Sequence, residues 1–267
     1  MEGNSHKGRL FIIGGAEDKQ GDCKILREFV RQAGGRQARV VVMTVATDLP
    51  KEVGDDYTAV FHRLGVEDVQ VLDTGRREDA DDPKGIAVIQ QASGVFFTGG
   101  NQARITEMLK GTQLDAVLHQ RLAEGLVIAG TSAGAAMMPD EMIVTGESET
   151  NPRMEVVEMG PGMAFLPGIV IDQHFAQRGR LGRLLSALMQ QPAVLGFGID
   201  ENTAIVVDGT SLQVIGEGAV TIVDVANVTY TNADQLLKDE DIAICGAKLH
   251  ILPHGYRFNI EKRTPDL

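Results

Sequence analysis

The feature that most constrains the fold of this chain is the alternation of short apolar runs with amphipathic stretches over its first half. Each run is rich in Val, Ile or Phe, as in strands that are buried on both faces of a parallel sheet. The runs are Arg9–Gly15, Arg39–Val45, Val69–Leu72, Gly94–Thr98 and Leu126–Ala129. Helical patterns separate them at Cys23–Ala33, Asp55–Leu64, Lys84–Gln91, Ala103–Lys110 and Leu114–Glu124. The alternation predicts an α/β fold with a doubly wound, mostly parallel sheet flanked by helices.

The second half of the chain departs from this alternation. It has strand patterns at Gly168–Asp172 and Thr203–Val207, a helical pattern at Leu181–Met189, and strand and turn signals from Leu212 to Ile260. We expect this last stretch to add antiparallel strands to the edge of the main sheet. Because no linker or repeat interrupts the 267 residues, we expect a single domain over residues 1–267.

Composition narrows the class of protein. A formal net charge of −12 argues against general binding to nucleic acid or to anionic membranes. No apolar run has the length of a transmembrane helix, and Leu10–Ile13 is too short for the core of a signal peptide. The two cysteines, Cys23 and Cys245, form no Cys-x-x-Cys motif and are expected to be reduced thiols. We therefore expect a cytoplasmic protein that folds without a metal or a disulfide.

The segment Gly130–Gly134 places a serine where a strand turns into a helix. Its sequence, Gly-Thr-Ser-Ala-Gly, follows a buried strand and precedes small residues that open a helix. This is the context of a nucleophile elbow, which exposes Oγ at the carboxyl end of a sheet. Ser132 is therefore the predicted nucleophile, and the Ala133 N–H is expected to face the oxyanion. An ordinary strand–helix turn is the alternative interpretation of the motif.

A second glycine-rich turn, Phe97–Gln102, follows another buried strand and also opens a helix. Glycine allows the backbone to approach a substrate carbonyl closely. We therefore expect Gly100 or Asn101 to complete the oxyanion hole, with Gln102 beside them at the substrate. A plain strand–helix connection is again the alternative.

A serine nucleophile needs a general base, and histidine is the side chain best suited to this near neutral pH. Among the six histidines, His174 directly follows a predicted strand, at the end where open α/β sheets bind ligands. A carboxylate should orient the imidazole, and Glu201 is the predicted one. Asp200 is its local rival, which could instead cap the turn. The order Ser132, His174, Glu201 differs from the α/β-hydrolase order of serine, acid and histidine.

Together these segments resemble the cyanophycinases (peptidase family S51), which are related to aspartyl dipeptidases and more remotely to class I glutamine amidotransferases. The matching stretches are Gly14–Lys19, Phe97–Gln102, Gly130–Gly134, Asp172–Arg183 and Gly198–Thr203. They span nearly the whole chain, and the run Asp-Gln-His-Phe followed by Arg-x-Arg-x-x-Arg is the most specific. The resemblance implies a class I glutamine amidotransferase-like, flavodoxin-like fold and a homodimer. It also implies a catalytic triad of Ser132, His174 and Glu201.

The resemblance further implies a serine exopeptidase that acts without a metal or cofactor. Its substrate would be cyanophycin, multi-L-arginyl-poly-L-aspartate, and its products β-Asp-Arg dipeptides released through an acyl-enzyme. The nearest alternative is an aspartyl dipeptidase acting on short α-linked peptides. A non-catalytic binding module is disfavoured because Ser, His and Glu all lie in suitable turns. A lipase-like esterase would need a different order of triad residues.

The expected substrate contacts lie beside the predicted base. The set is Asp172, Gln173, Arg178, Arg180 and Arg183. Arg180 and Arg183 are spaced to share a helix face, and paired guanidinium groups suit a free carboxylate. Asp172, or an acid near Glu147 and Glu149, is expected to hold the ammonium or guanidinium of the substrate. A solvated helix face is the alternative interpretation of the arginines.

Overall fold

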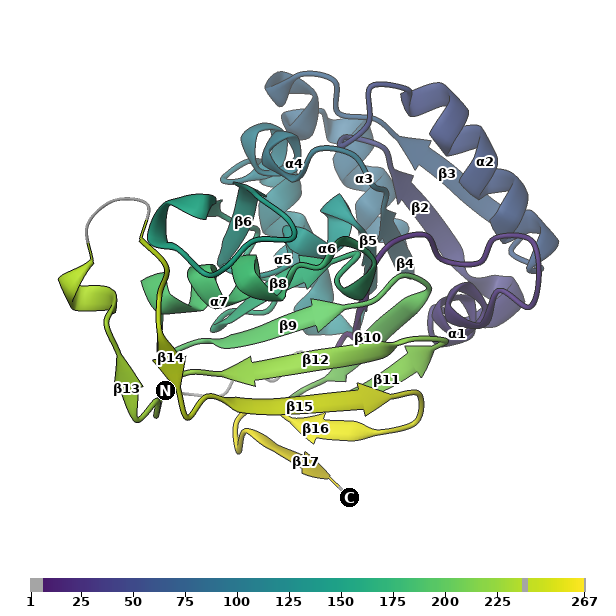
Figure 1. The fold of residues 1–267 in the computed structure, drawn as a ribbon. Coiled ribbons are helices and arrows are strands. Elements are labelled where there is room, and N and C mark those ends of the chain that lie inside the picture. Colours follow the sequence, from purple (N-terminus) through teal and green to yellow (C-terminus); the bar gives the residue numbers. More distant parts are fainter. Residues whose placement is uncertain (1–6, 237–239, 267) are drawn as a thin grey trace.

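A nine-stranded sheet runs through the computed structural model, which describes residues 7–236 and 240–266 (Figure 1). Its parallel strands are β1 (Leu10–Ile13), β2 (Arg39–Met43), β3 (Asp68–Leu72), β4 (Gly94–Phe97) and β5 (Val127–Thr131). Its antiparallel strands are β10 (Thr203–Asp208), β11 (Ser211–Gly216), β16 (Arg257–Asn259) and β17 (Thr264–Asp266). The order across the sheet is β17-β16-β11-β10-β1-β5-β4-β2-β3. The predicted α/β fold with added antiparallel strands is therefore confirmed.

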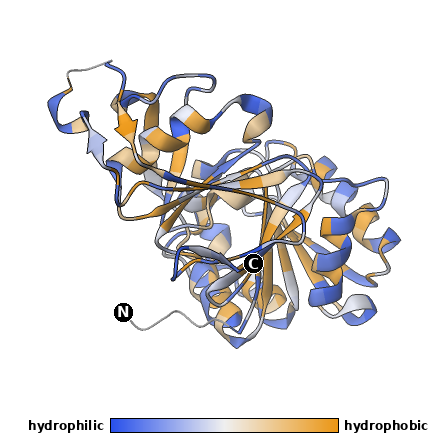
Figure 2. Cartoon of the chain, turned by 60° about the horizontal axis from the view of Figure 1, so that its bottom comes forward, coloured by the Kyte–Doolittle hydropathy of each residue, from blue (hydrophilic) through white to orange (hydrophobic). Residues whose placement is uncertain are grey.

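Helices cover both faces of the parallel half of this sheet. One face packs against α1 (Lys24–Gln32) and α2 (Pro50–Arg63). The other packs against α3 (Pro83–Gln91), α4 (Gln102–Leu109) and α5 (Gln113–Glu124). A short helix, α6 (Ala133–Ala136), follows β5 directly. In Figure 2 the strands of this sheet are largely hydrophobic, while the helices carry hydrophilic residues along their outer sides.

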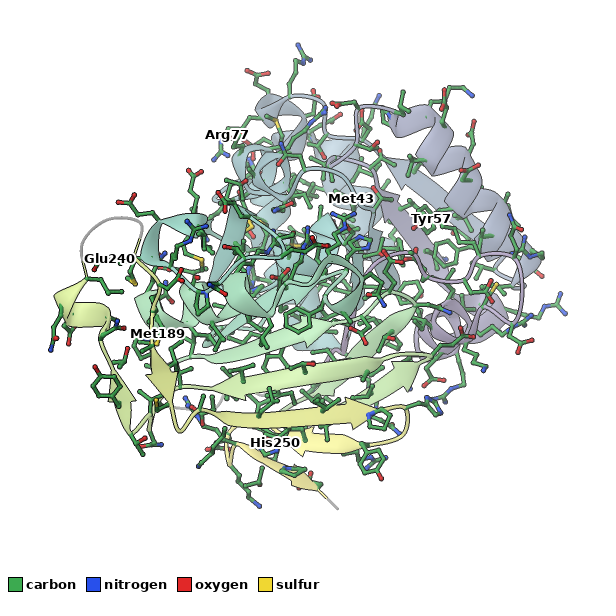
Figure 3. The ribbon with its side chains drawn as sticks, viewed as in Figure 1. Met43, Tyr57, Arg77, Met189, Glu240 and His250 are labelled. Carbon is green, nitrogen blue, oxygen red and sulfur yellow. The ribbon has the colours of Figure 1, made fainter. Side chains whose placement is uncertain are left out.

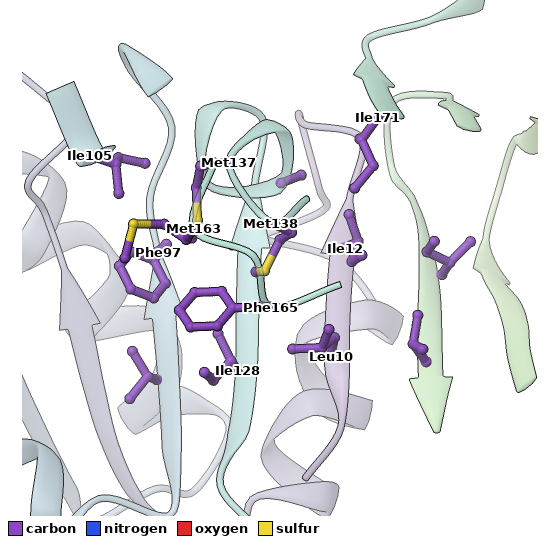
Figure 4. Packing of buried hydrophobic residues seen from close by; sticks show 14 of the residues in the cluster. Leu10, Ile12, Phe97, Ile105, Ile128, Met137, Met138, Met163, Phe165 and Ile171 are labelled. Atoms are coloured by element: carbon purple, nitrogen blue, oxygen red, sulfur yellow. The ribbon is translucent and has the colours of Figure 1, made fainter. Parts of the chain in front are cut away.

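The side-chain alternation of β4 shows why this sheet needs helices on both faces. Phe96 points to the α1–α2 face, where its ring lies 5.8 Å from Phe29 and 5.5 Å from Phe61, measured between centroids. Phe97 points the other way and packs 6.4 Å from Phe165, in the cluster drawn in Figure 4. All five rings are fully buried, and burying each contributes about 1.5–3 kcal/mol. A one-sided sheet would leave one of the two strand phenylalanines in water.

A second sheet packs across the antiparallel half of the first, and this was not expected. It contains β8 (Ile169–Gln173), β9 (Leu195–Ile199), β12 (Ala219–Asp224) and β15 (Lys248–Pro253), in the order β15-β12-β9-β8. The rings of Phe197 and Phe258 meet between the two sheets with centroids 6.4 Å apart. The expectation that all C-terminal strands extend the main sheet is therefore wrong, because β12 and β15 bury their inner side chains against it instead.

Helix α7 (Leu181–Gln190) covers the outer side of β8 and β9, close to the predicted base. A Cβ on Gly196 would lie 2.7 Å from Leu188 Cδ1 and 3.1 Å from Leu184 Cδ1. Glycine in β9 therefore allows α7 to approach the sheet closely, although it weakens the strand signal in the sequence.

The remaining elements are short. Two hairpins are formed by β6 (Glu141–Gly146) with β7 (Val157–Pro161), and by β13 (Tyr230–Thr231) with β14 (Ile244–Cys245). The 3-10 turns are η1 (Gly35–Gln37), η2 (Arg77–Asp81), η3 (Met154–Val156), η4 (Ala176–Arg178) and η5 (Ala233–Gln235). Within the described ranges, no helix is both long and apolar enough to cross a membrane.

Candidate active site

Three loops from distant parts of the sequence meet at the carboxyl end of β1. The carbonyl oxygens of three consecutive residues there each accept a backbone N–H from one loop. The bonds are Ser132 N to Ile13 O at 3.0 Å, His174 N to Gly14 O at 2.8 Å and Asn202 N to Gly15 O at 2.8 Å. The end of β1 therefore fixes the backbone of the predicted nucleophile, the predicted base and the residue after the predicted acid.

The structure brings Ser132, His174 and Glu201 into one line of contacts. Ser132 Oγ lies 3.1 Å from His174 Nε2, and His174 Nδ1 lies 2.6 Å from Glu201 Oε1. The His174 side chain is nearly buried, whereas that of Glu201 is 35% exposed. Ser132 has φ 53° and ψ −110°, a strained conformation for a residue with a side chain. This geometry matches the sharp strand–helix turn expected from the sequence.

Asp200, the rival acid, is engaged elsewhere. Its Oδ1 accepts the Ala176 N–H at 3.1 Å and its Oδ2 accepts the Ala219 N–H at 3.1 Å. Both oxygens thus join backbone segments of neighbouring elements. Of the two adjacent acids, Glu201 is the one beside the imidazole.

Gly15 is a site residue that the sequence reasoning did not single out. It has φ +99°, and a Cβ there would lie 2.4 Å from both Cε1 and Nε2 of His174. The only signal in the sequence was its place in the stretch Gly14–Lys19 that resembles the cyanophycinases. Glycine at this position therefore leaves the space that the imidazole occupies.

Replacing Gly15 by alanine is expected to lower kcat about 100-fold, because the imidazole must move away from Ser132 Oγ. Gly255→Ala is the matched control, since Gly255 also has a positive φ, +91°, but no atom within 4 Å of an added Cβ. Both variants should lose similar stability from backbone strain. Steady-state kinetics and thermal unfolding of the two variants separate these effects. Equal kcat values would contradict the steric role of Gly15.

The backbone N–H groups predicted to form the oxyanion hole differ in whether they are already hydrogen-bonded within the protein. Ala133 is the first residue of α6. The N–H groups in the first turn of a helix have no acceptor within the helix, so the Ala133 N–H is free to bind another oxygen. The Asn101 N–H donates to Ala46 O at 2.9 Å, which corrects the expectation that it faces the substrate. Gly100 therefore remains the predicted donor of that pair. Gly99, which was not predicted, packs against the nucleophile: a Cβ on it would lie 3.8 Å from Ser132 Oγ.

The side chains of Asn101 and Gln102 make local structural contacts. Asn101 Oδ1 accepts the Ala103 N–H at 3.0 Å and caps the start of α4. Gln102 Nε2 donates to the carbonyl oxygens of Ile143 and Val144, at 3.0 and 2.7 Å. Gln102 thus ties α4 to β6, and these contacts do not fit the expectation that it binds substrate.

Asp172 and Arg183 bind each other in the interior. Arg183 Nη2 and Nε donate to the two carboxylate oxygens at 2.6 and 2.7 Å, a bidentate pair. The Asp172 side chain is 0% exposed and that of Arg183 is 7% exposed. The expectation that Asp172 holds a substrate cation and Arg183 a substrate carboxylate is therefore corrected. The two residues already satisfy each other, and both side chains are buried.

Asp172→Ala is expected to lower the free energy of unfolding by about 3–5 kcal/mol, because the buried Arg183 guanidinium loses its counter-charge. The double variant Asp172→Leu, Arg183→Met should recover most of this loss, since an apolar pair can replace a buried ion pair. Urea denaturation of wild type and both variants measures the change. A stable Asp172→Ala protein with a raised KM would instead restore Asp172 as a substrate contact.

Arg180 lies beside this pair and holds the residue before the predicted base. Its Nη1 donates to the Gln173 carbonyl oxygen at 2.6 Å, and its side chain is 7% exposed. Burial, together with the charges of Arg183 and Arg178, lowers the pKa of the Arg180 guanidinium to about 10, and Asp172 opposes this. Arg180 therefore remains a cation at neutral pH. Arg178, on η4, is the exposed member of the three predicted arginines.

A pocket of about 240 Å³ opens beside Ser132. It is lined by Ala16, Glu17, Lys19, Val53, Tyr57, Gly99, Thr131 and Ser132. Glu17 is only 4% exposed, and its carboxylate accepts hydrogen bonds from the hydroxyls of Tyr57 and Thr131. Burial and the neighbouring Glu17 carboxylate raise the pKa of the Tyr57 phenol well above its usual value, so it remains a hydrogen-bond donor. Tyr57 lies on the inner side of α2, between that helix and the centre of the molecule (Figure 3).

The fold and this site define the chain as an α/β enzyme of the hydrolase class. The chain belongs to peptidase family S51, whose family profile, "Peptidase family S51", matches residues 10–215. Within residues 7–236 and 240–266, no group of three His, Cys, Asp or Glu side chains is placed to hold a metal ion.

Curated relatives match this chain over nearly its whole length. A protein named "Cyanophycinase" from Trichormus variabilis is 40% identical over 260 residues, which cover 97% of this chain and 87% of that protein. One of the same name from Geminocystis herdmanii is 39% identical over 258 residues, covering 96% of this chain and 95% of that protein. These likenesses place the chain among the cyanophycinase-like members of the family.

Solved structures share the fold at lower sequence identity. A peptidase from an acI-B1 Actinobacterium matches with a TM-score of 0.70 and 19% identity, covering 96% of this chain and 98% of its own. A putative peptidase E protein from Listeria monocytogenes matches with a TM-score of 0.54 and 16% identity, covering 78% of this chain and 98% of its own. The overall fold of this chain is thus shared with these solved structures.

Proposed function

We propose that this protein is a serine exopeptidase that hydrolyses cyanophycin to β-Asp-Arg dipeptides, with Ser132, His174 and Glu201 as its catalytic triad. The observation that carries the proposal is the line from Ser132 Oγ to His174 Nε2, 3.1 Å, and from His174 Nδ1 to Glu201 Oε1, 2.6 Å. The choice of substrate is supported by the name of the curated relatives, which are 39–40% identical to this chain.

The proposed reaction begins when His174 Nε2 takes the proton of Ser132 Oγ as this oxygen attacks the substrate carbonyl carbon. The Glu201 carboxylate stabilises the imidazolium that forms. The N–H groups of Ala133 and Gly100 stabilise the negative charge on the carbonyl oxygen. His174 then gives its proton to the departing amine, and an acyl-enzyme remains on Ser132. A water molecule, deprotonated by His174, releases the acyl group and restores the serine.

Incubation with purified cyanophycin, followed by mass analysis of the products, tests the substrate. We expect β-Asp-Arg dipeptides that accumulate from the start of the reaction without longer fragments, as an exopeptidase produces them. Release of free arginine would show that the enzyme cleaves the bond between aspartate and arginine, and would contradict the proposed cleavage of the aspartate backbone. Hydrolysis of short α-linked aspartyl peptides with the polymer left intact would favour the aspartyl dipeptidase alternative.

We also propose that the protein acts in the cytoplasm as a homodimer. Cys23 and Cys245 are free thiols, which is usual in a reducing compartment. Leu249 and Ile251, on β15, expose 52% and 62% of their surface and offer an apolar area to a second copy. Light scattering at several protein concentrations measures the mass, and a particle with the mass of one chain at all of them would contradict the dimer.

A further inference from the structure

We propose that Lys19 is a specificity-determining residue, whose ammonium group binds a free carboxylate of the substrate on the Tyr57 side of Ser132. This inference rests on the proposed function, because the substrate it concerns is the β-Asp-Arg polymer. Each dipeptide unit of that polymer carries a free carboxylate on its arginine. An enzyme that processes it therefore needs a cation near the nucleophile.

The arginines expected to supply that cation are largely committed to the interior. Arg183 is paired with Asp172, and Arg180 is held by Gln173. Lys19, by contrast, is half-buried and lines the pocket that contains Ser132. It also lines an adjoining hollow of about 570 Å³, whose wall includes residues of α2. Lys19 thus lies where the two spaces join, in the wall of the pocket that also contains Ser132.

A rigid turn presents the Lys19 side chain. The Asp18 carboxylate accepts the N–H groups of Gln20, Gly21 and Cys23 at 2.7–2.9 Å. These hydrogen bonds lower the pKa of the Asp18 carboxyl to about 2, and the one from Cys23 has the largest effect. The carboxyl therefore remains a charged acceptor. The Asp18 N–H in turn donates to Asn202 Oδ1 at 2.9 Å, next to Glu201. The backbone of the turn is therefore fixed to the loop of the predicted acid.

Two further contacts fix Lys19 from the side of α2. An Arg63 N–H donates to the Lys19 carbonyl oxygen. The Lys19 ammonium lies 4.4 Å from the centroid of the Tyr57 ring, a cation–π contact. Tyr57 is itself held by its hydrogen bond to the buried Glu17. The ammonium is thus preorganised, and a substrate that binds it loses little side-chain entropy in doing so.

The charges around the pocket leave Lys19 available to an anion. In the part of the chain that the structure describes, the Lys19 ammonium makes no ion pair within 4.0 Å. Among the wall carboxylates, Glu17 is buried and accepts two hydroxyl donors, and Asp18 accepts three backbone N–H groups of its own turn. Asp56 lines the adjoining hollow and not the pocket that contains Ser132. A substrate carboxylate can accept charge-assisted hydrogen bonds from the Lys19 ammonium while the ammonium keeps its contact with the Tyr57 ring.

The experiment compares a soluble β-Asp-Arg trimer with its analogue in which every arginine carboxylate is a primary amide. For the trimer, Lys19→Met should lower kcat/KM about 10- to 100-fold, mainly by raising KM, because one charge-assisted contact is lost. For the amide, wild type and Lys19→Met should have equal kcat/KM. Lys19→Arg keeps the charge and should retain most of the preference for the carboxylate. Lys262→Met, in the exposed turn between β16 and β17, is the control and should behave as wild type.

The outcomes separate this inference from the proposed function. If wild type hydrolyses neither the polymer nor the trimer, the proposed function fails and the inference fails with it. If wild type is active and Lys19→Met loses the same factor with both substrates, Lys19 does not bind the carboxylate. An unchanged or lowered KM for Lys19→Met with the trimer would also overturn it.

Discussion

Ser132→Ala is expected to lower kcat on cyanophycin by a factor of about 10⁴–10⁶ while the protein stays folded. The reason is that alanine removes the only atom that forms the acyl-enzyme, whereas the turn that carries it is held by the backbone. The Ser132 N–H bond to Ile13 O is independent of the side chain. Product formation by mass analysis, together with binding of the polymer to the variant, measures the two parts of this prediction. Binding should be close to that of wild type.

Ser211→Ala provides a matched control for this loss. Ser211 lies in β11, in the antiparallel half of the main sheet, and its replacement removes the same hydroxyl group. This variant should retain wild-type kcat and thermal stability. If Ser132→Ala hydrolysed the polymer at the rate of Ser211→Ala, Ser132 would not be the nucleophile, and the proposed mechanism would have to be abandoned.

The parallel half of the fold could be predicted because its signals are local. The strand Gly94–Phe97 is apolar at every position, which in a parallel sheet means burial on both faces. The second sheet could not be predicted in the same way. Its strand Leu195–Ile199 contains Gly196 and Gly198, which weaken a strand pattern. These glycines are required by neighbours distant in the sequence: a Cβ on Gly198 would lie 2.4 Å from the Phe175 ring.

The candidate site was predictable where its chemistry depends on residue type. A serine in a sharp turn and a histidine after a strand each carry a local signal, and the structure places them together. The expected roles of Asp172 and Arg183 were wrong because spacing shows a shared helix face but not which side of it faces the interior. Gly15 and Glu17 were missed since their importance arises from contacts with residues more than a hundred positions away.

Glu201→Gln is expected to lower kcat by a factor of about 10³–10⁴, a smaller loss than that from removing the serine. Glu201 Oε1 accepts the proton on His174 Nδ1, which leaves Nε2 free to take the proton of Ser132 Oγ. A glutamine can turn its amide NH₂ toward Nδ1, and the ring proton then moves to Nε2. In that tautomer the imidazole cannot act as a base, and no charge stabilises the imidazolium.

Asp200→Asn is the matched control, because it makes the same chemical change one residue away. Asn has one acceptor oxygen in place of two, so one of the bonds to the Ala176 and Ala219 N–H groups is lost. We expect a loss of about 1 kcal/mol in the free energy of unfolding and little change in kcat. Kinetics and urea denaturation of the two variants decide between the acids. If Asp200→Asn lost the greater part of kcat and Glu201→Gln did not, the third member of the proposed triad would be Asp200, and the imidazole would have to turn from its present position to reach it.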